Sequence, residues 1–157
     1  MADLRDIIAY YCKKYPHKTE LSKARLTKMV YLADWKSCID RSKQISKIQW
    51  VYNHYGPYVE DVANVAQTDD IFDLKSTINF LGKSKQVVKL KSENYDTKSL
   101  SVADKNILDH IISITSKRYW NSFIELVYST YPIIKSEKFS NLNLVELAEE
   151  YKQNKPE

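Results

Sequence analysis

The stretch from Ser22 to Ile39, SKARLTKMVYLADWKSCI, decides the fold of this chain. Its apolar side chains recur at helical spacing and cover much of one helix circumference: Leu26, Met29, Val30, Leu32, Ala33, Trp35 and Ile39. Ser22 stands just before them and is a typical N-cap residue. A helix that is apolar on so many sides packs against several neighbours, so we expect it at the centre of the fold.

Further helices are predicted on both sides of this central helix. Upstream, Asp3 to Tyr15 carries apolar side chains at helical spacing, and Pro16 ends that helix. Downstream, Ser101 and Asp104 form a weak capping box for another helix. The last two helices are predicted from Trp120 to a stop at Pro132, and from about Asn143.

The stretch from Trp50 to Asp61, WVYNHYGPYVED, contains one of only two glycines in the chain. Apolar and polar side chains alternate from Ile45 to Tyr55, which predicts extended chain. Gly56 interrupts this pattern, and Pro57 has a backbone suited to the first turn of a helix. We therefore expect Gly56 and Pro57 to be a structural turn from extended chain into a helix.

A β-hairpin is predicted further along the chain. Its strands run from Thr77 to Leu81 and from Gln86 to Lys91, around a turn that contains Gly82. The fold class is accordingly mainly α (α+β), a single compact helical domain with a small antiparallel β-hairpin or sheet. We expect residues 1–140 to form that domain and residues 141–157 a C-terminal helix followed by a disordered tail, QNKPE.

Composition indicates an ordinary soluble protein. The 157 residues suit one domain, with 43% hydrophobic and 28% charged residues. No apolar run approaches the roughly 20 residues needed to span a bilayer. The N-terminus carries acids among its apolar residues, unlike a signal peptide. We expect a cytoplasmic protein without a membrane partner.

Charge is distributed unevenly along the chain. Lys and Arg dominate from Lys13 to Lys47, acids dominate from Glu60 to Asp73, and lysines return from Lys75 to Lys98. Alternating signs favour oriented docking of a charged partner over a uniform grip on a polyanion. Nucleic-acid binding by the basic segments is therefore kept as an alternative that is not favoured.

Catalytic and metal-binding motifs are absent from the sequence. It contains no Gly-rich phosphate loop, no HExxH and no cysteine pair at metal spacing. The chain is therefore expected not to be an enzyme and to need no cofactor and no metal. A hydrolase or transferase that uses His54 with Glu60 or Asp61 stays as a further alternative.

Aromatic residues are abundant, with 12 tyrosines and 3 tryptophans. Tyr and Trp offer large contact areas at low entropic cost and are enriched in protein-binding hot spots. So many tyrosines do not all fit into one small core, which indicates an exposed aromatic surface.

Two segments carry a resemblance to a known family. Leu26 to Asp34, LTKMVYLAD, is followed by the aromatic segment that closes at Gly56-Pro57, and both are similar to segments of the Panacea antitoxin domain, the SocA-like family. The late residues Trp120, Phe123 and Pro132 resemble the final helix of that family. The resemblance extends from about Leu4 to Pro132.

The resemblance implies a bacterial or phage toxin–antitoxin system, in which this protein binds and neutralises a cognate toxin protein. A protease adaptor or a nucleic-acid-binding regulator is the alternative, so a protease is a further expected partner. The expected partner-binding residues lie on the aromatic segment and the nearby helix: Trp50, Tyr52, His54, Tyr55, Tyr58, Lys28, Tyr31 and Asp34. Trp50 and Tyr31 are equally compatible with core packing, and Tyr55 and Tyr58, which flank the bend, are the better candidates.

Overall fold

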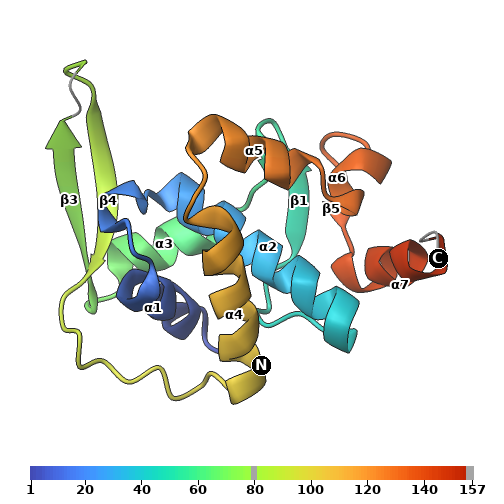
Figure 1. The fold of residues 1–157 in the computed structure, drawn as a ribbon, viewed down its shortest axis with the longest axis horizontal. Coiled ribbons are helices and arrows are strands. Elements are labelled where there is room, and N and C mark those ends of the chain that lie inside the picture. Colours follow the sequence, from blue (N-terminus) through green and yellow to red (C-terminus); the bar gives the residue numbers. More distant parts are fainter. Residues whose placement is uncertain (79–80, 155–157) are drawn as a thin grey trace.

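Helix α2 (Lys23–Arg41) runs through the centre of the computed structural model, which describes residues 1–78 and 81–154 (Figure 1). Every residue from Arg25 to Trp35 is buried. Helices α1, α3, α4 and α7 all pack against α2. The Ser22 hydroxyl accepts a hydrogen bond from the Arg25 N–H at 3.1 Å, as expected of the N-cap. The prediction of a central helix is confirmed.

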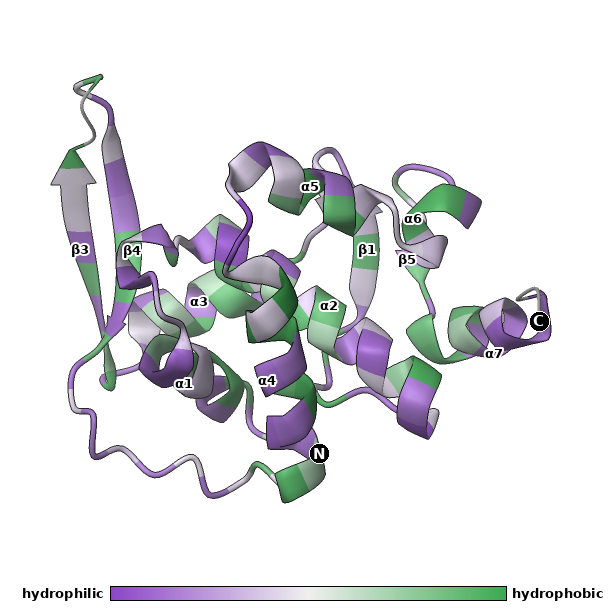
Figure 2. Ribbon diagram, viewed as in Figure 1, coloured by the Kyte–Doolittle hydropathy of each residue, from purple (hydrophilic) through white to green (hydrophobic). Residues whose placement is uncertain are grey.

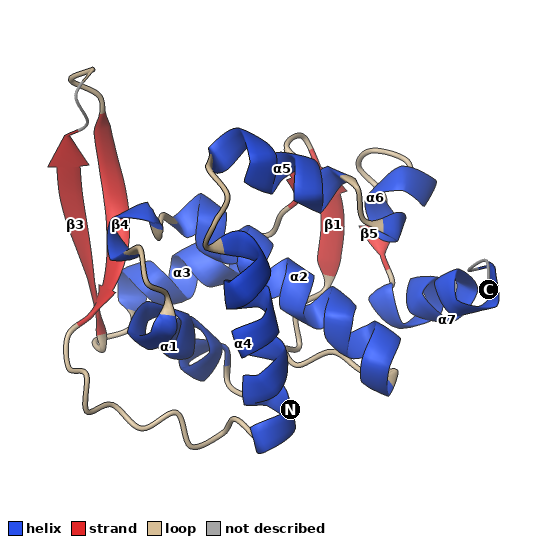
Figure 3. Cartoon of the chain, in the orientation of Figure 1, coloured by secondary structure: helices blue, strands red, loops and turns tan. Residues whose placement is uncertain are grey.

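The remaining elements surround α2 (Figure 3). The other α-helices are α1 (Leu4–Lys14), α3 (Asp61–Thr68), α4 (Val102–Thr115), α5 (Trp120–Tyr128), α6 (Tyr131–Lys135) and α7 (Leu144–Asn154). A short 3-10 helix, η1 (Lys18–Glu20), precedes α2. The strands are β1 (Trp50–Asn53), β2 (Gly56–Pro57), β3 (Phe72–Ile78), β4 (Ser84–Leu90) and β5 (Asn141–Leu142). The predicted mainly α fold with small antiparallel β elements is confirmed.

The strands form two separate antiparallel sheets. In the first, β1 lies between β2 and β5, with Tyr52 opposite Pro57 and Trp50 opposite Leu142. The second is the β3–β4 hairpin, which pairs Phe72 with Leu90 and extends beyond the helices in Figure 1. Figure 2 shows hydrophilic stretches on both strands of this hairpin. None of the helices in the described residues has the length and apolar character required to cross a membrane.

The predicted start of α4 and the predicted end of α1 are both confirmed, because each depends on residues close together in the chain. In the capping box of α4, the Ser101 hydroxyl accepts from the Asp104 N–H, and the Asp104 carboxylate accepts from the Ser101 N–H, both at 3.0 Å. Helix α1 ends at Lys14, before Pro16. Both helices therefore begin or end where their side chains indicated.

The predicted role of Gly56 and Pro57 as the start of a helix is wrong. Gly56 has a φ of +96°, and both residues belong to β2, which pairs with β1. Helix α3 begins only at Asp61. Proline is also compatible with an edge strand, because no neighbouring strand there needs a hydrogen bond from its missing N–H. The local pattern did not distinguish this tight hairpin from a helix start.

Three further boundaries differ from the predictions. Helix α5 ends at Tyr128, and Pro132 lies in the first turn of α6 rather than at a helix end, because proline is also favoured in a first turn. The first hairpin strand starts at Phe72, and the predicted part at residues 79–80 lies outside the described residues. Extended structure after α2 is limited to β1, so residues 45–49 form no strand.

The C-terminal segment is more ordered than predicted. Gln153 and Asn154 belong to α7, and residues 155–157 of the expected disordered tail lie outside the described residues. Helix α7 packs against α2, where the Tyr151 and Trp35 ring centroids lie 5.7 Å apart. A domain boundary at residue 140 stays a prediction.

One buried carboxylate, Asp34, holds the chain that follows α2. Its oxygens accept hydrogen bonds from the N–H groups of Ile45 and Ser46 and from the indole N–H of Trp50, each at 2.9 Å. The Ser46 hydroxyl and the Gln44 amide also donate to it. Burial raises the pKa of Asp34, and these hydrogen bonds oppose the rise. The loop between α2 and β1 is therefore attached to the middle of α2.

Replacement of Asp34 by Asn is expected to destabilise the fold strongly. The Asn side chain has the same shape, but its NH₂ group replaces one acceptor oxygen and faces buried N–H and O–H donors. We expect this to lower the free energy of unfolding by about 3 kcal/mol. Asp40→Asn, which removes the same charge from an exposed site on the same helix, is expected to cost less than about 0.5 kcal/mol. Urea unfolding of both variants measures the difference, and equal losses would contradict a structural role for Asp34.

Candidate protein-binding site

Three of the predicted contact residues, Tyr31, Asp34 and Trp50, lie in the core. The Tyr31 and Trp50 rings meet edge to face at 5.5 Å, and the Tyr31 hydroxyl bonds to the Thr130 hydroxyl at 2.8 Å. All three side chains are at most 1% exposed. They position β1 and the turn that follows it, and they offer no surface to a partner in this structure.

The turn between β1 and β2 presents aromatic groups to solvent. Tyr55 is 74% exposed, and its ring stands nearly perpendicular to that of His54, with centroids 4.6 Å apart. The His54 ring stacks against Phe139 at 6.4 Å. Tyr52 is half-buried, and its N–H donates to the Ser140 carbonyl at 2.9 Å. The turn is thus held from the side by the segment before β5.

A pocket of about 300 Å³ brings four of the predicted residues together. We call it the Lys28 pocket, and it is lined by Ala24, Lys28, Asn53, His54, Tyr55, Tyr58 and Trp120. Its walls come from three segments: α2, the β1–β2 turn with Tyr58, and the start of α5. Its position next to both better candidates, Tyr55 and Tyr58, makes it the candidate site.

The Lys28 side chain is unusual for a lysine. It is 4% exposed, and burial lowers the pKa of its ammonium. Its Nζ lies 5.9 Å from the centroid of the Tyr58 ring, a cation–π contact. Within residues 1–78 and 81–154, no hydrogen bond or ion pair reaches this ammonium. Lys28 thus contributes an unneutralised cation to an aromatic pocket.

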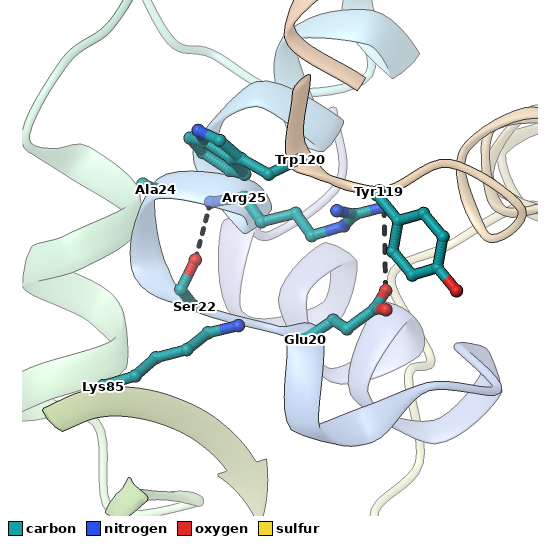
Figure 4. Close-up of a pocket in the computed structure, with 7 residues that line it drawn as sticks. All are labelled: Glu20, Ser22, Ala24, Arg25, Lys85, Tyr119 and Trp120. Atoms are coloured by element: carbon teal, nitrogen blue, oxygen red, sulfur yellow. Dashed lines mark hydrogen bonds and ion pairs between the residues drawn. The ribbon is translucent and has the colours of Figure 1, made fainter. Parts of the chain in front are cut away.

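A second pocket of about 420 Å³ adjoins the first, because both include Ala24 and Trp120. It is lined by Glu20, Ser22, Ala24, Arg25, Lys85, Tyr119 and Trp120 (Figure 4). We call the two pockets together the α2 groove. Tyr119 is 83% exposed and Trp120 45% exposed. The groove therefore carries exposed aromatic side chains from the β1–β2 turn and from the start of α5.

Arg25 attaches the start of α5 to α2. Its Nη2 donates to the backbone carbonyls of Thr115 and Arg118 at 2.9 and 3.0 Å, just before Tyr119. Its guanidinium carbon lies 4.4 Å from the centroid of the Phe123 ring, a cation–π contact. Figure 4 shows its side chain extending between Trp120 and Glu20, and the ion pair to Glu20 measures 3.9 Å. Arg25 thereby fixes the aromatic pair at one side of the groove.

Sequence reasoning missed Arg25, Tyr119 and Trp120 as parts of the site. The sequence places Trp120 only at the start of a predicted helix, in the segment that resembles the final helix of the family. A usable signal was present, since two adjacent large aromatics directly before and at the start of a helix seldom both fit into its buried face. Their place beside Ala24 depends on packing between segments far apart in the chain.

The geometry gives no support to the alternative catalytic pairs. No hydrogen bond or ion pair joins His54 to Glu60 or Asp61 in the described part of the chain. Burial raises the pKa of both free cysteines, Cys12 and Cys38, to about 12, so neither is a thiolate at neutral pH. Over those same residues, no three His, Cys, Asp or Glu side chains gather where they could hold a metal ion.

The chain matches the family model described as antitoxin SocA-like, Panacea domain, over residues 26–132. That range includes α2 from Leu26 onward, the β1–β2 turn and α5, and it leaves out the groove residues that precede Leu26. Because the match covers more than half of the chain, the protein belongs to the SocA-like Panacea antitoxin family. No curated protein and no solved structure matches it significantly. Family membership supports an antitoxin role in general, and with it a partner protein and a non-enzymatic role.

The β1–β2 hairpin allows a matched comparison of two glycines, Gly56 and Gly82. A Cβ added at Gly56 would lie 3.4 Å from the Tyr128 ring, whereas one added at Gly82 would meet nothing within 4 Å. Both have positive φ, so we expect Gly82→Ala to cost about 1 kcal/mol and Gly56→Ala about 2 kcal/mol or more. Urea unfolding of the two variants measures the costs, and a smaller loss for Gly56→Ala would contradict close packing of the turn on α5.

Proposed function

We propose that this protein is the antitoxin of a bacterial or phage toxin–antitoxin pair and neutralises its cognate toxin in the cytoplasm by direct protein–protein binding. In this proposal it catalyses no reaction and needs no cofactor. The observation that carries the proposal is the α2 groove, in a chain that belongs to an antitoxin family. Tyr55, Tyr58 and Trp120 are the central contact residues.

The groove has the physical character of a protein-binding surface. Tyr and Trp bury large areas with few rotatable bonds, so ordering them at an interface costs little conformational entropy. Buried polar contacts fix both sides of the groove before any partner arrives: Asp34 holds the chain that leads into β1, and Arg25 holds the start of α5. Such preorganisation favours tight binding.

The nucleic-acid alternative has one observation in its favour. The β3–β4 hairpin extends from the body of the protein (Figure 1) and carries Lys75, Lys85 and Lys89. Lysines on exposed strands also prevent unwanted strand pairing. A fall of DNA affinity by orders of magnitude between low and physiological salt would support this alternative.

Co-expression with the neighbouring gene tests the proposed function. The neighbouring product is expected to arrest growth when expressed alone, and this protein is expected to restore growth and to co-purify with it. Restored growth with loss of the neighbouring product from the cell would instead indicate a protease adaptor. A harmless neighbour that never co-purifies would overturn the proposal.

Replacement of both Tyr55 and Tyr58 by Ala is expected to weaken binding of the co-purified partner at least about ten-fold. Tyr55 is mostly exposed and Tyr58 half-buried, so the melting temperature should fall by only a few degrees. Calorimetric titration measures the affinity, and thermal unfolding followed by circular dichroism measures the stability.

A double variant at other exposed apolar residues, Val102→Ala with Ile134→Ala, serves as the control. These side chains are 76% and 67% exposed and line neither pocket of the groove. The control is expected to bind the partner normally. Equal binding by the tyrosine variant and the control would remove Tyr55 and Tyr58 from the interface.

A further inference from the structure

The Lys28 side chain is buried, and no carboxylate in the described part of the chain forms an ion pair with its ammonium. A lysine is seldom this deeply buried without a paired acid. Burial accordingly lowers the pKa of Lys28. The Tyr58 ring at 5.9 Å is the one contact that compensates this charge in the described residues. The pocket therefore lacks one group, an anion that would pair with the Lys28 ammonium.

The chemistry of the surrounding wall restricts which anion fits. Apart from Lys28, no Lys or Arg lines the Lys28 pocket, and Tyr55, Tyr58 and Trp120 form aromatic walls. A phosphate group is usually bound by several donors or by the bidentate fork of Arg, and a single lysine is a point charge. A singly charged carboxylate matches one ammonium. The aromatic walls favour an apolar group beside that carboxylate.

The size of the pocket points the same way. A volume of about 300 Å³ is at the lower end of the range for small-ligand sites. It accommodates a short acidic side chain with a neighbouring apolar or aromatic side chain. Ala24 and Trp120 line both pockets, so a segment bound in the Lys28 pocket lies next to the pocket that contains Arg25 and Lys85.

We propose that the Lys28 pocket binds a carboxylate of the partner protein, from an Asp or Glu that stands next to an apolar or aromatic residue. This inference rests on the proposed function for the identity of the partner, and on the pocket itself for the chemistry of the contact. The Lys28 side chain is already 4% exposed in the free protein, so burying the rest of it adds little desolvation cost on binding. A bound carboxylate with an apolar neighbour would displace water from the aromatic walls, which strengthens the electrostatic attraction of the ion pair.

The experiment uses a matched pair of small probes and no toxin. The wild-type protein is titrated with indole-3-acetate and with the neutral indole-3-acetamide, and amide and indole resonances are followed by two-dimensional NMR. The acetate is expected to shift resonances of Lys28, Tyr55, Tyr58 and Trp120 saturably and to bind at least about ten-fold more tightly than the acetamide. Equal affinities, or no saturable shift at these residues, would overturn the proposal.

Two variants test whether Lys28 causes the preference for the acetate over the acetamide. Lys28→Met keeps the length of the side chain without its charge and is expected to bind both probes equally, with unchanged or higher stability because an unpaired buried charge is removed. Lys36→Met removes the same charge from a half-buried site on α2, outside the groove, and is expected to keep the preference. A preference that persists in Lys28→Met would overturn the proposal even where the wild type prefers the acetate.

A third titration, with inorganic phosphate, separates carboxylate from phosphate recognition. Tighter binding of phosphate than of indole-3-acetate at the same residues would overturn the proposal in favour of a phosphorylated ligand. None of these titrations uses the product of the neighbouring gene, so their results do not depend on the co-expression experiment. If co-expression fails but the protein still prefers the acetate, the proposed partner is wrong and the carboxylate site stands. If co-expression succeeds but the acetate preference is absent, the antitoxin function stands and the carboxylate contact is wrong.

Discussion

The carboxylate of Asp34 is the contact on which the rest of the structure depends. It lies in the middle of α2, is fully buried, and accepts hydrogen bonds from the backbone at Ile45 and Ser46 and from the Trp50 indole. A buried carboxylate without such donors would be strongly destabilising, so these contacts stabilise the observed path of the loop after α2. That path places β1 beside α2 and the β1–β2 turn beside the groove.

Three charged side chains of α2 are buried, and they differ in how they are satisfied. Asp34 and Arg25 are both hydrogen-bonded to the backbone of other segments, and thereby fix the two sides of the groove. Lys28, between them on the same helix, has only an aromatic ring for a partner in the described chain. The first two charges serve the fold. In the proposal above, the third serves recognition, and its pocket lies beside exposed aromatic side chains.

Local patterns predicted the elements that local interactions determine. The caps at Ser22 and Ser101 and the stripe of α2 were predicted, because capping and helix periodicity need only neighbours in the chain. Gly56-Pro57 and Pro132 were misread, because proline suits an edge strand as well as the first turn of a helix. Strand β5 has two residues and exists only through its pairing with β1, so it left no periodic signal.

The sequence by itself determined the central helix, the mainly α class and the resemblance to an antitoxin family, since these depend on residue types at short spacing. Only the tertiary structure decided which predicted contact residues are available. Tyr31, Asp34 and Trp50 became core, Tyr55 and Tyr58 came to line a pocket, and Trp120 joined them from a distant segment. The physical reason is that burial and pocket shape depend on contacts between segments far apart in the chain, and a Lys or a Tyr looks the same in sequence whether buried or exposed.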